Sequence, residues 1–267
     1  MTSPGEISGK PTRPDPEPSP IEEKLRAQTP ARLLAGRSGA AYRTNTQLDL
    51  REAHAAARDA VRAELDLRAD FGQDFITRWN LFEVCSRATS KHEYLICPDL
   101  GRRFNPASRA EIDHRCPAEP DFQILIGDGL SSTAVKAQVP QLLPLLFQGA
   151  QTRGWKIGSL PVVRYCRVGI LNEIGELLRP AVAVLLIGER PGLATAESLS
   201  AYMAYCPKPS DTDANRNLIS NIHARGVSPQ SAADRILNLA AWMMQSQNSG
   251  YQLREQLISE PSLSRPT

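Results

Sequence analysis

Two apolar runs in the second half of the chain each end in a turn that contains glycine. The runs are Phe122–Ile126 and Val182–Ile187, followed by the turns Gly127–Gly129 and Gly188–Gly192. Neither run alternates polar with apolar residues, which is typical of a parallel strand that is buried on both faces. Ligands of open α/β sheets bind where such strands end, and glycine lets a backbone approach closely. The pattern predicts two core strands with a ligand site at their carboxyl ends.

The sequence around these two runs alternates between strand and helix patterns. Apolar periodicity and the Ser228–Pro229 cap define a final helix, whose predicted buried face carries Ala232, Ile236, Leu239 and Met243. The other predicted elements of this half are a helix over 131–149 with breaks or kinks at Pro140 and Pro144, strands over 161–167 and 182–187, a short helical turn that ends near Arg179, and a more exposed strand over 198–206.

In the N-terminal half, a polar segment is followed by segments with helical patterns. Residues 1–28 are rich in Pro, Ser and Glu, which predicts a disordered tail. Short helices are predicted over 29–34 and 107–116, and a longer one over 47–67. The apolar stripe of the longer helix includes His54, which is expected to be partly buried. A row of arginines on another face of this helix is either a solvated surface or a phosphate clamp: Arg51, Arg58 and Arg62.

These patterns predict an α/β fold, with a Rossmann-like, mainly parallel sheet flanked by helices, a helical N-terminal region and a disordered N-terminal tail. The expected divisions are a tail over 1–28, a mainly helical region over 29–118, a Rossmann-like domain over 119–250 and a C-terminal tail over 251–267.

Composition narrows the function classes. The chain has 267 residues, 41% of them hydrophobic and 22% charged, so a globular protein with a substantial core is expected. A net charge of +2 gives no reason to expect a nucleic-acid partner. No apolar run reaches the roughly 20 residues that span a bilayer, so a cytoplasmic protein without a membrane partner is expected. The five cysteines form no CxxC pair, which favours reduced thiols over a disulfide framework or a zinc site.

The motifs for common enzyme chemistries are incomplete. The turn at 127–132 reads GDGLSS, which lacks the third glycine and the later acidic residue of a dinucleotide site. A P-loop and a GxSxG nucleophile elbow are absent from the sequence. Glu189, at the end of a predicted strand, is either a ligand-binding carboxylate or a solvated partner of Arg190. The polar segment 213–223 either caps backbone groups or surrounds an amide-rich ligand.

Seven segments, in this order, resemble the small subunit of ethanolamine ammonia-lyase. The GERPGL and ISNIH sequences are the most specific of them. The segments are TPARLLAGRSGAAYRT (29–44), PDLGRRF (98–104), ILIGDGLSS (124–132), VRYCRVG (163–169), IGERPGL (187–193), ESLSAYMAYCP (197–207) and RNLISNIHARG (216–226).

The resemblance implies a lyase that converts ethanolamine to acetaldehyde and ammonia with adenosylcobalamin, through an adenosyl radical supplied by the cofactor. It implies that a TIM-barrel large subunit binds ethanolamine, that this chain carries no catalytic residue and no metal ligand, and that the assembly has six copies of each subunit. Matching positions imply cobalamin contacts at Val168, Glu189 and Leu218. Leu218 departs from the cysteine of a familiar member, which a backbone contact would tolerate.

Two other function classes stay open at this point. One is an NAD-linked oxidoreductase that uses the Gly127–Gly129 turn, and the other is a non-catalytic interaction module. The resemblance also leaves open whether the protein is free in the cytoplasm or enclosed in a bacterial microcompartment. The segment 1–28 has too few apolar residues to form a clear encapsulation helix, so a free cytoplasmic enzyme stays an alternative.

Overall fold

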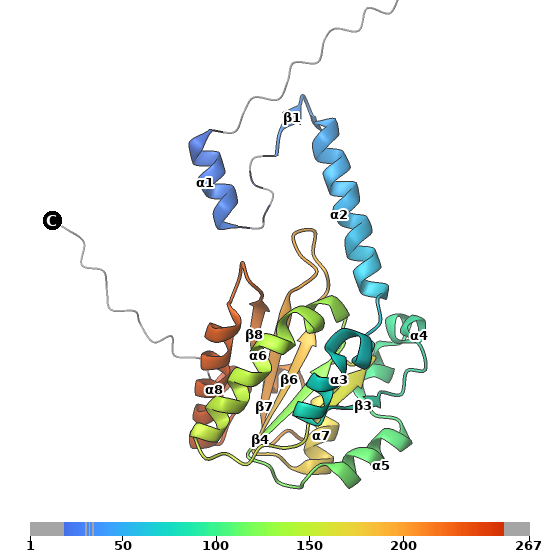
Figure 1. Cartoon of the computed structure of the whole chain (residues 1–267), viewed down its shortest axis with the longest axis vertical. Coiled ribbons are helices and arrows are strands. Elements are labelled where there is room, and N and C mark those ends of the chain that lie inside the picture. The colour runs from blue at the N-terminus through green and yellow to red at the C-terminus, as the bar shows by residue number, and fades with distance from the viewer. Residues whose placement is uncertain (1–18, 30, 32, 34, 254–267) are drawn as a thin grey trace, which may run out of the picture.

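The computed structural model describes residues 19–29, 31, 33 and 35–253. It is a mixed α/β structure with one six-stranded sheet, of strand order β3-β5-β4-β6-β7-β8 (Figure 1). The strands β3, β5, β4 and β6 run parallel, β7 is antiparallel to β6, and β8 is antiparallel to β7. The strands are β3 (Phe82–Cys85), β4 (Phe122–Gly127), β5 (Pro161–Arg164), β6 (Val182–Gly188), β7 (Leu199–Tyr205) and β8 (Asn217–Ile222).

Helices cover both faces of this sheet, and a small hairpin of β1 (Arg37–Ser38) and β2 (Ala41–Tyr42) lies apart from it. The α-helices are α1 (Pro20–Gln28), α2 (Thr44–Arg62), α3 (Leu67–Trp79), α4 (Lys91–Ile96), α5 (Pro106–Arg115), α6 (Ser132–Thr152), α7 (Ile170–Leu178) and α8 (Pro229–Ser246). Short 3₁₀ turns are η1 (Pro98–Arg102), η2 (Asp213–Asn215) and η3 (Gly250–Gln252).

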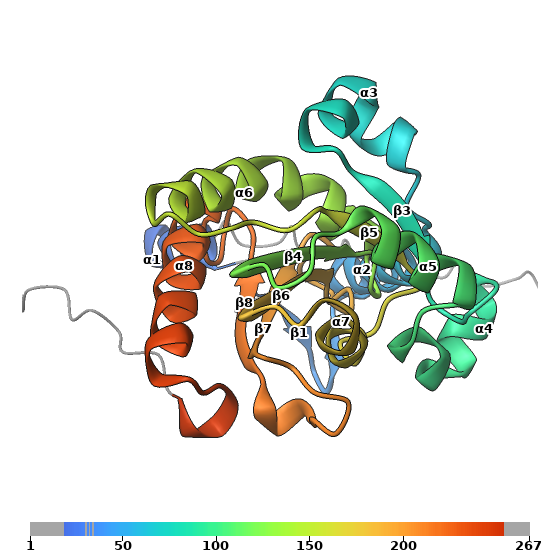
Figure 2. The same ribbon diagram turned by 90° about the horizontal axis from the view of Figure 1, so that it is seen from below.

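Strand alternation divides the buried residues between two apolar layers. Ile124 and Ile126 of β4 belong to the apolar layer that includes residues of α6 and α8, whereas Leu125 belongs to the layer that includes residues of α7. Figure 2 shows α6 and α7 on opposite sides of the sheet. All six residues of β4, including the polar Gln123, and all seven of β6 are buried, as their non-alternating apolar runs predict. The predicted α/β class, with a mostly parallel sheet flanked by helices, is confirmed.

Several other predicted elements are also confirmed. The helix predicted over 131–149 is α6, Ser132 to Thr152, but it continues through Pro140 and Pro144 without the break expected there. The final helix begins after the Ser228 cap. Its predicted inner face is buried throughout, with Ala232, Ile236, Leu239 and Met243 in the core.

Several of the predictions for the N-terminal half of the chain are wrong. Residues 20–28 form α1 instead of a disordered tail, because Ser19 and Glu22 form a capping box before it; residues 1–18 lie outside the described chain. The predicted helix over 29–34 is wrong at Ala31 and Leu33, which lie in a bend and a turn, and its other positions 30, 32 and 34 lie outside the described chain. The helix predicted over 47–67 exists as α2, but it ends earlier, at Arg62, and Leu67 is the first residue of α3.

The start of α3 follows from Asp66. Its side chain accepts hydrogen bonds from the N–H groups of Arg68 and Ala69 at 3.0 and 2.9 Å, so it caps the N-terminus of α3. The preceding helix α2 ends at Arg62, and Ala63 has extended backbone angles. The prediction for His54 is also wrong: it is exposed on α2.

The strand predicted to be more exposed, over 198–206, is in fact buried. β7 lies between β6 and β8, and Leu199, Ala201 and Met203 belong to the main core. The strand β8 was not predicted, because its two buried residues Ile219 and Ile222 are three positions apart. A bulge explains this spacing, since Ala201 pairs with Ile219 whereas Leu199 pairs with Ile222.

The strand β3 was also missed. It lies within the region predicted as mainly helical, yet it pairs with β5 in register over its full length. The sheet therefore uses residues from both sides of position 119. The boundary proposed at that position stays a prediction.

Candidate functional site

The two glycine turns lie side by side at the carboxyl edge of the sheet. β4 and β6 pair in register, with Gly127 opposite Ile187. The Leu130 N–H donates to the Gly188 carbonyl oxygen at 3.0 Å, and a Cβ added to Gly129 would lie 2.3 Å from that oxygen. Gly129 also has a φ of +57°. Glycine is needed here because the two turns touch through their backbones.

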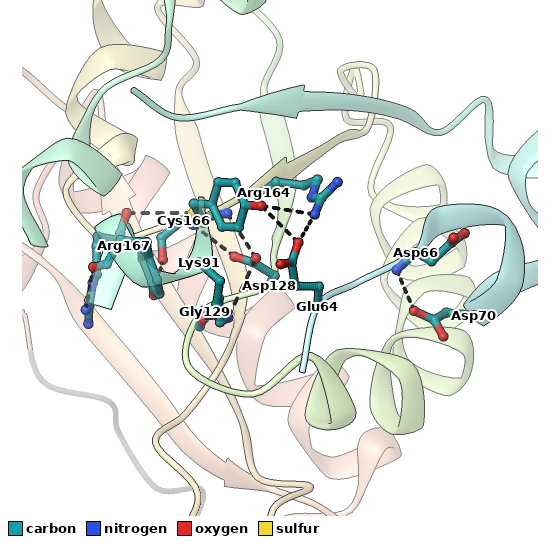
Figure 3. A network of polar contacts seen from close by, with 11 residues as sticks. Glu64, Asp66, Asp70, Lys91, Asp128, Gly129, Arg164, Cys166 and Arg167 are labelled. Atoms are coloured by element: carbon teal, nitrogen blue, oxygen red, sulfur yellow. Dashed lines mark hydrogen bonds and ion pairs between the residues drawn. The ribbon is translucent and has the colours of Figure 1, made fainter. Parts of the chain in front are cut away.

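Asp128, in the first turn, joins three segments of the chain (Figure 3). It is fully buried, and its two carboxylate oxygens accept the backbone N–H groups of Tyr165 and Cys166, each at 2.9 Å. The Lys91 ammonium lies 4.0 Å from Asp128 Oδ2 and donates to the Gly129 carbonyl oxygen at 3.1 Å. Asp128 therefore holds the end of β5 and the start of α4 against the first turn.

Burial shifts the pKa values of both members of this ion pair toward the neutral forms. Burial raises the pKa of Asp128, although Lys91 and the two backbone N–H groups act in the opposite direction. Burial lowers the pKa of Lys91, and Asp128 opposes that shift. Each charged group therefore depends on the other, because an isolated buried charge is costly.

Glu189, directly after β6, is held by groups from two other strands and a loop. Its Oε2 accepts the Ser198 hydroxyl at 2.8 Å, while Oε1 accepts the Ser200 hydroxyl and the Asn221 N–H, the latter at 3.2 Å. The side chain is half-buried, and no ion pair with Arg190 exists within the described residues. Of the two interpretations of Glu189, the solvated ion pair is wrong.

The bulge of β8 supplies the backbone donor to Glu189. Asn221 has a φ of +61°, which turns its N–H toward the carboxylate. The Asn221 side chain is held in turn by the buried His223 ring, with Nε2 at 2.7 Å from Oδ1. The ISNIH segment therefore shapes a strand irregularity, and the interpretation of these polar residues as backbone caps describes only part of their role.

Val168 and Leu218 lie in two neighbouring cavities. Val168 is half-buried before α7 and lines a cavity of about 500 Å³. Leu218, 46% exposed on β8, lines a second cavity of about 460 Å³. Asp213 and Arg216 line both cavities. The structure thus places Val168 and Leu218 on either side of Arg216, and it does not bring Val168, Glu189 and Leu218 into one cavity.

Arg216 belongs to the polar segment 213–223, but the sequence did not assign it a role of its own. Its side chain is 4% exposed, pairs with Asp213 and donates to Asn172 Oδ1 at 2.6 Å. Its buried Nε has no hydrogen-bond partner among the described residues, and the same holds for Nε of Arg167, which lines the cavity beside Val168. These guanidinium groups retain donors that a polar ligand could use.

The loop after β6 covers the place where a dinucleotide would bind. A pyrophosphate requires the free N-terminus of the helix after β4. Here Ser131, the cap of α6, donates to the Ala196 carbonyl oxygen at 2.6 Å, and Gln138 donates to that of Glu197 at 3.3 Å. This contact, together with the buried Asp128, removes the geometric support for an NAD site.

Other observations concern metals and membranes. Over the described residues, no three His, Cys, Asp or Glu side chains gather as a metal site would require. Within the same residues, every helix is too short or too polar to cross a membrane.

The fold and this edge define a mixed α/β protein whose charged and polar groups gather at the carboxyl ends of parallel strands. The family model of the ethanolamine ammonia-lyase light chain matches residues 20–254, and the chain belongs to this family. Three bacterial proteins similar to it are each named ethanolamine ammonia-lyase small subunit.

The identities to these relatives are near 40% over most of the chain. The Clostridium perfringens protein is 43% identical over 231 residues, which are 86% of this chain and 76% of the relative. The Clostridium acetobutylicum protein is 40% identical over 86% of this chain and 93% of the relative. The Fusobacterium nucleatum protein is 39% identical over 86% of this chain and 76% of the relative. The resemblance seen in the motifs is confirmed, and the terms light chain and small subunit imply a larger partner in a lyase complex.

Proposed function

We propose that this chain is the cofactor-enclosing subunit of an ethanolamine ammonia-lyase, which uses adenosylcobalamin to convert ethanolamine to acetaldehyde and ammonia. Family membership supports the lyase assignment. When bound, adenosylcobalamin supplies the radical chemistry, so the protein has to bind and orient it and exclude water. The partner is a large subunit, proposed to be a TIM barrel in an assembly with six copies of each chain.

The Glu189 carboxylate is the observation that carries the cofactor part of this proposal. A carboxylate offers about four acceptor positions, and three donors of the chain itself occupy most of them. The remaining position suits one N–H donor, such as a primary amide. The edge of a corrin carries several such amides, so a fixed carboxylate acceptor fits this group.

The guanidinium groups beside Val168 add donors for amide oxygens. Arg167 and Arg216 each keep a buried Nε–H without a partner among the described residues. A ligand rich in amides can meet both kinds of group, accepting from the arginines and donating to Glu189. The role of this chain is therefore to bind and orient; we propose that it contributes no general acid, base or nucleophile.

The test is a titration of the two-subunit complex with adenosylcobalamin, followed by its visible absorption. The Glu189→Ala variant should bind the cofactor roughly 10-fold more weakly or worse, because a hydrogen bond to a charged group contributes about 1.5–3 kcal/mol. The Glu197→Ala variant is the matched control, since Glu197 is an exposed carboxylate of the same loop, and among the described residues only its backbone forms hydrogen bonds.

Two outcomes would contradict the proposal. A wild-type complex that binds no corrin would remove the cofactor role altogether. Unchanged affinity in Glu189→Ala, in a complex of normal stability, would favour the interaction-module interpretation for this edge. Cytoplasmic or microcompartment location is a separate proposal, which fractionation of the native host would decide.

A further inference from the structure

A cavity lies between α2 and the loop after β6. It has a volume of about 940 Å³, within the range of small-molecule sites. Arg51, His54 and Arg58 line it from α2, which rises from the body of the molecule beside the loop in Figure 1. Arg167 and Arg190 line the opposite wall.

The cavity carries an excess of positive charge. It is lined by four arginines and by no Asp or Glu. Within the described residues, Arg51, Arg58 and Arg190 form no ion pair, whereas Arg109, Arg164 and Arg216 each pair with a carboxylate. Two of the acidic residues of α2, Asp49 and Glu52, line a separate groove of about 410 Å³. An anionic group entering the cavity would meet uncompensated charge.

The spacing of the two α2 arginines suits a single ligand. Arg51 and Arg58 are seven positions apart, so they share one helix face and lie about 10 Å apart along the axis. Guanidinium forks bind phosphate oxygens in pairs, with stronger hydrogen bonds than neutral donors form. The arginine row was left open as a solvated face or a phosphate clamp, and its position on a cavity favours the clamp.

The rest of the lining is apolar. Leu95 and Leu130 line the cavity and pack against a small buried cluster of Ala88, Tyr94 and Tyr165, and Val61 and Pro191 add to the apolar surface. Such a cavity accommodates a flat apolar group joined to an anion better than it accommodates free phosphate. Its far wall also adjoins the proposed contacts, because Arg167 precedes Val168 and Arg190 follows Glu189 in the chain.

We propose that this cavity binds the nucleotide tail of the cofactor, with Arg51 and Arg58 on the phosphodiester and the apolar lining against the attached aromatic base. This inference rests on the proposed function and extends it to a site that includes α2. The two arginines are binding residues, and they take no part in bond breaking.

The experiment compares two corrins in the two-subunit complex. Adenosylcobalamin carries the phosphodiester and the base, whereas adenosylcobinamide lacks both and keeps the corrin amides. Binding is followed by visible absorption for wild type and for Arg51→Ala/Arg58→Ala. The double variant should bind adenosylcobalamin roughly 10- to 100-fold more weakly, as expected for the loss of charge-assisted hydrogen bonds, and adenosylcobinamide with unchanged affinity.

The control is Arg62→Ala, which removes an exposed arginine of α2 that does not line the cavity. It should leave both affinities unchanged. An equal loss for both corrins in the double variant would overturn the proposal, as would unchanged affinity for both. Dissociation of the subunits on gel filtration, with no selective loss of adenosylcobalamin, would assign the arginines to an acidic surface of the large subunit instead. Failure of the wild-type complex to bind either corrin would reject the proposed function itself.

Discussion

Asp128 and Glu189 are two carboxylates at one sheet edge with different roles, which their surroundings decide. Asp128 is fully buried and meets two backbone N–H groups and Lys91, so a ligand cannot reach its carboxylate. Glu189 is half-buried and held by donors from one side. The sequence marked Glu189 as a site residue through its position after a strand. The donors Ser198, Ser200 and Asn221 could not be found that way, because they come from β8 and from the start of β7.

Removing the charge of Asp128 should destabilise the fold. In Asp128→Asn, one of the two backbone N–H groups faces an amide NH₂, and Lys91 is left buried without a counter-charge. We expect a loss of about 3 kcal/mol in the free energy of unfolding, measured by urea denaturation of the full chain.

Lys91→Met and the double variant Asp128→Asn/Lys91→Met complete a cycle for this pair. The double variant should lose clearly less than the sum of the two single losses, because it leaves neither charge unpaired. Strict additivity would show that the two side chains act independently, in contradiction to the 4.0 Å ion pair.

At the scale of helices and strands, the predictions succeeded where the apolar pattern of a segment itself indicates its structure. They failed where burial depends on the neighbouring strands in the sheet. β4, β6 and the inner face of α8 followed from apolar patterns alone. β7 looked half-exposed because small and polar residues alternate along it, yet its position inside the sheet buries it. β8 was missed because a bulge breaks the two-residue period that identifies a strand.

The contact between the turns after β4 and β6 can be tested with two glycines. Gly129→Ala should cost about 3 kcal/mol or more, because it combines a φ of +57° with a Cβ that would lie 2.3 Å from the Gly188 oxygen. Gly154→Ala is the matched control: its φ is +72°, but nothing lies within 4 Å of the added Cβ. It should cost only about 1 kcal/mol, from backbone strain. Equal losses in urea denaturation would mean that the two turns are not in contact.

At the scale of the whole molecule, the polar edge of the sheet and the cavity beside α2 are the two places proposed to bind the cofactor. The carboxylates near this edge are already engaged by the chain's own donors: Asp128 by Lys91, Glu189 by two serines, and the buried Glu173 by Arg109 and the Phe104 N–H. Groups held in this way are suited to positioning a ligand. They are poorly suited to proton transfer, which needs a group that can reach the substrate.

The purified chain should therefore have no lyase activity by itself. With ethanolamine and adenosylcobalamin it is expected to release no acetaldehyde, measured by coupled reduction with alcohol dehydrogenase and NADH. Addition of the large subunit should produce activity, and a large subunit mixed with a chain denatured beforehand serves as the control. Acetaldehyde formed by the chain alone would show that it carries catalytic groups of its own.

The sequence by itself determined the α/β class, the two core strands with their glycine turns, and the family, because these depend on local periodicity and on ordered motifs. Only the tertiary structure decided which groups meet at the edge. Lys91 and Asp128 are 37 positions apart, and Asn221 donates to Glu189 across 32 positions. The arginines of α2 likewise line a cavity only because a distant loop faces them. Such contacts depend on strand order, on register and on a bulge, and a local pattern of residues does not specify them.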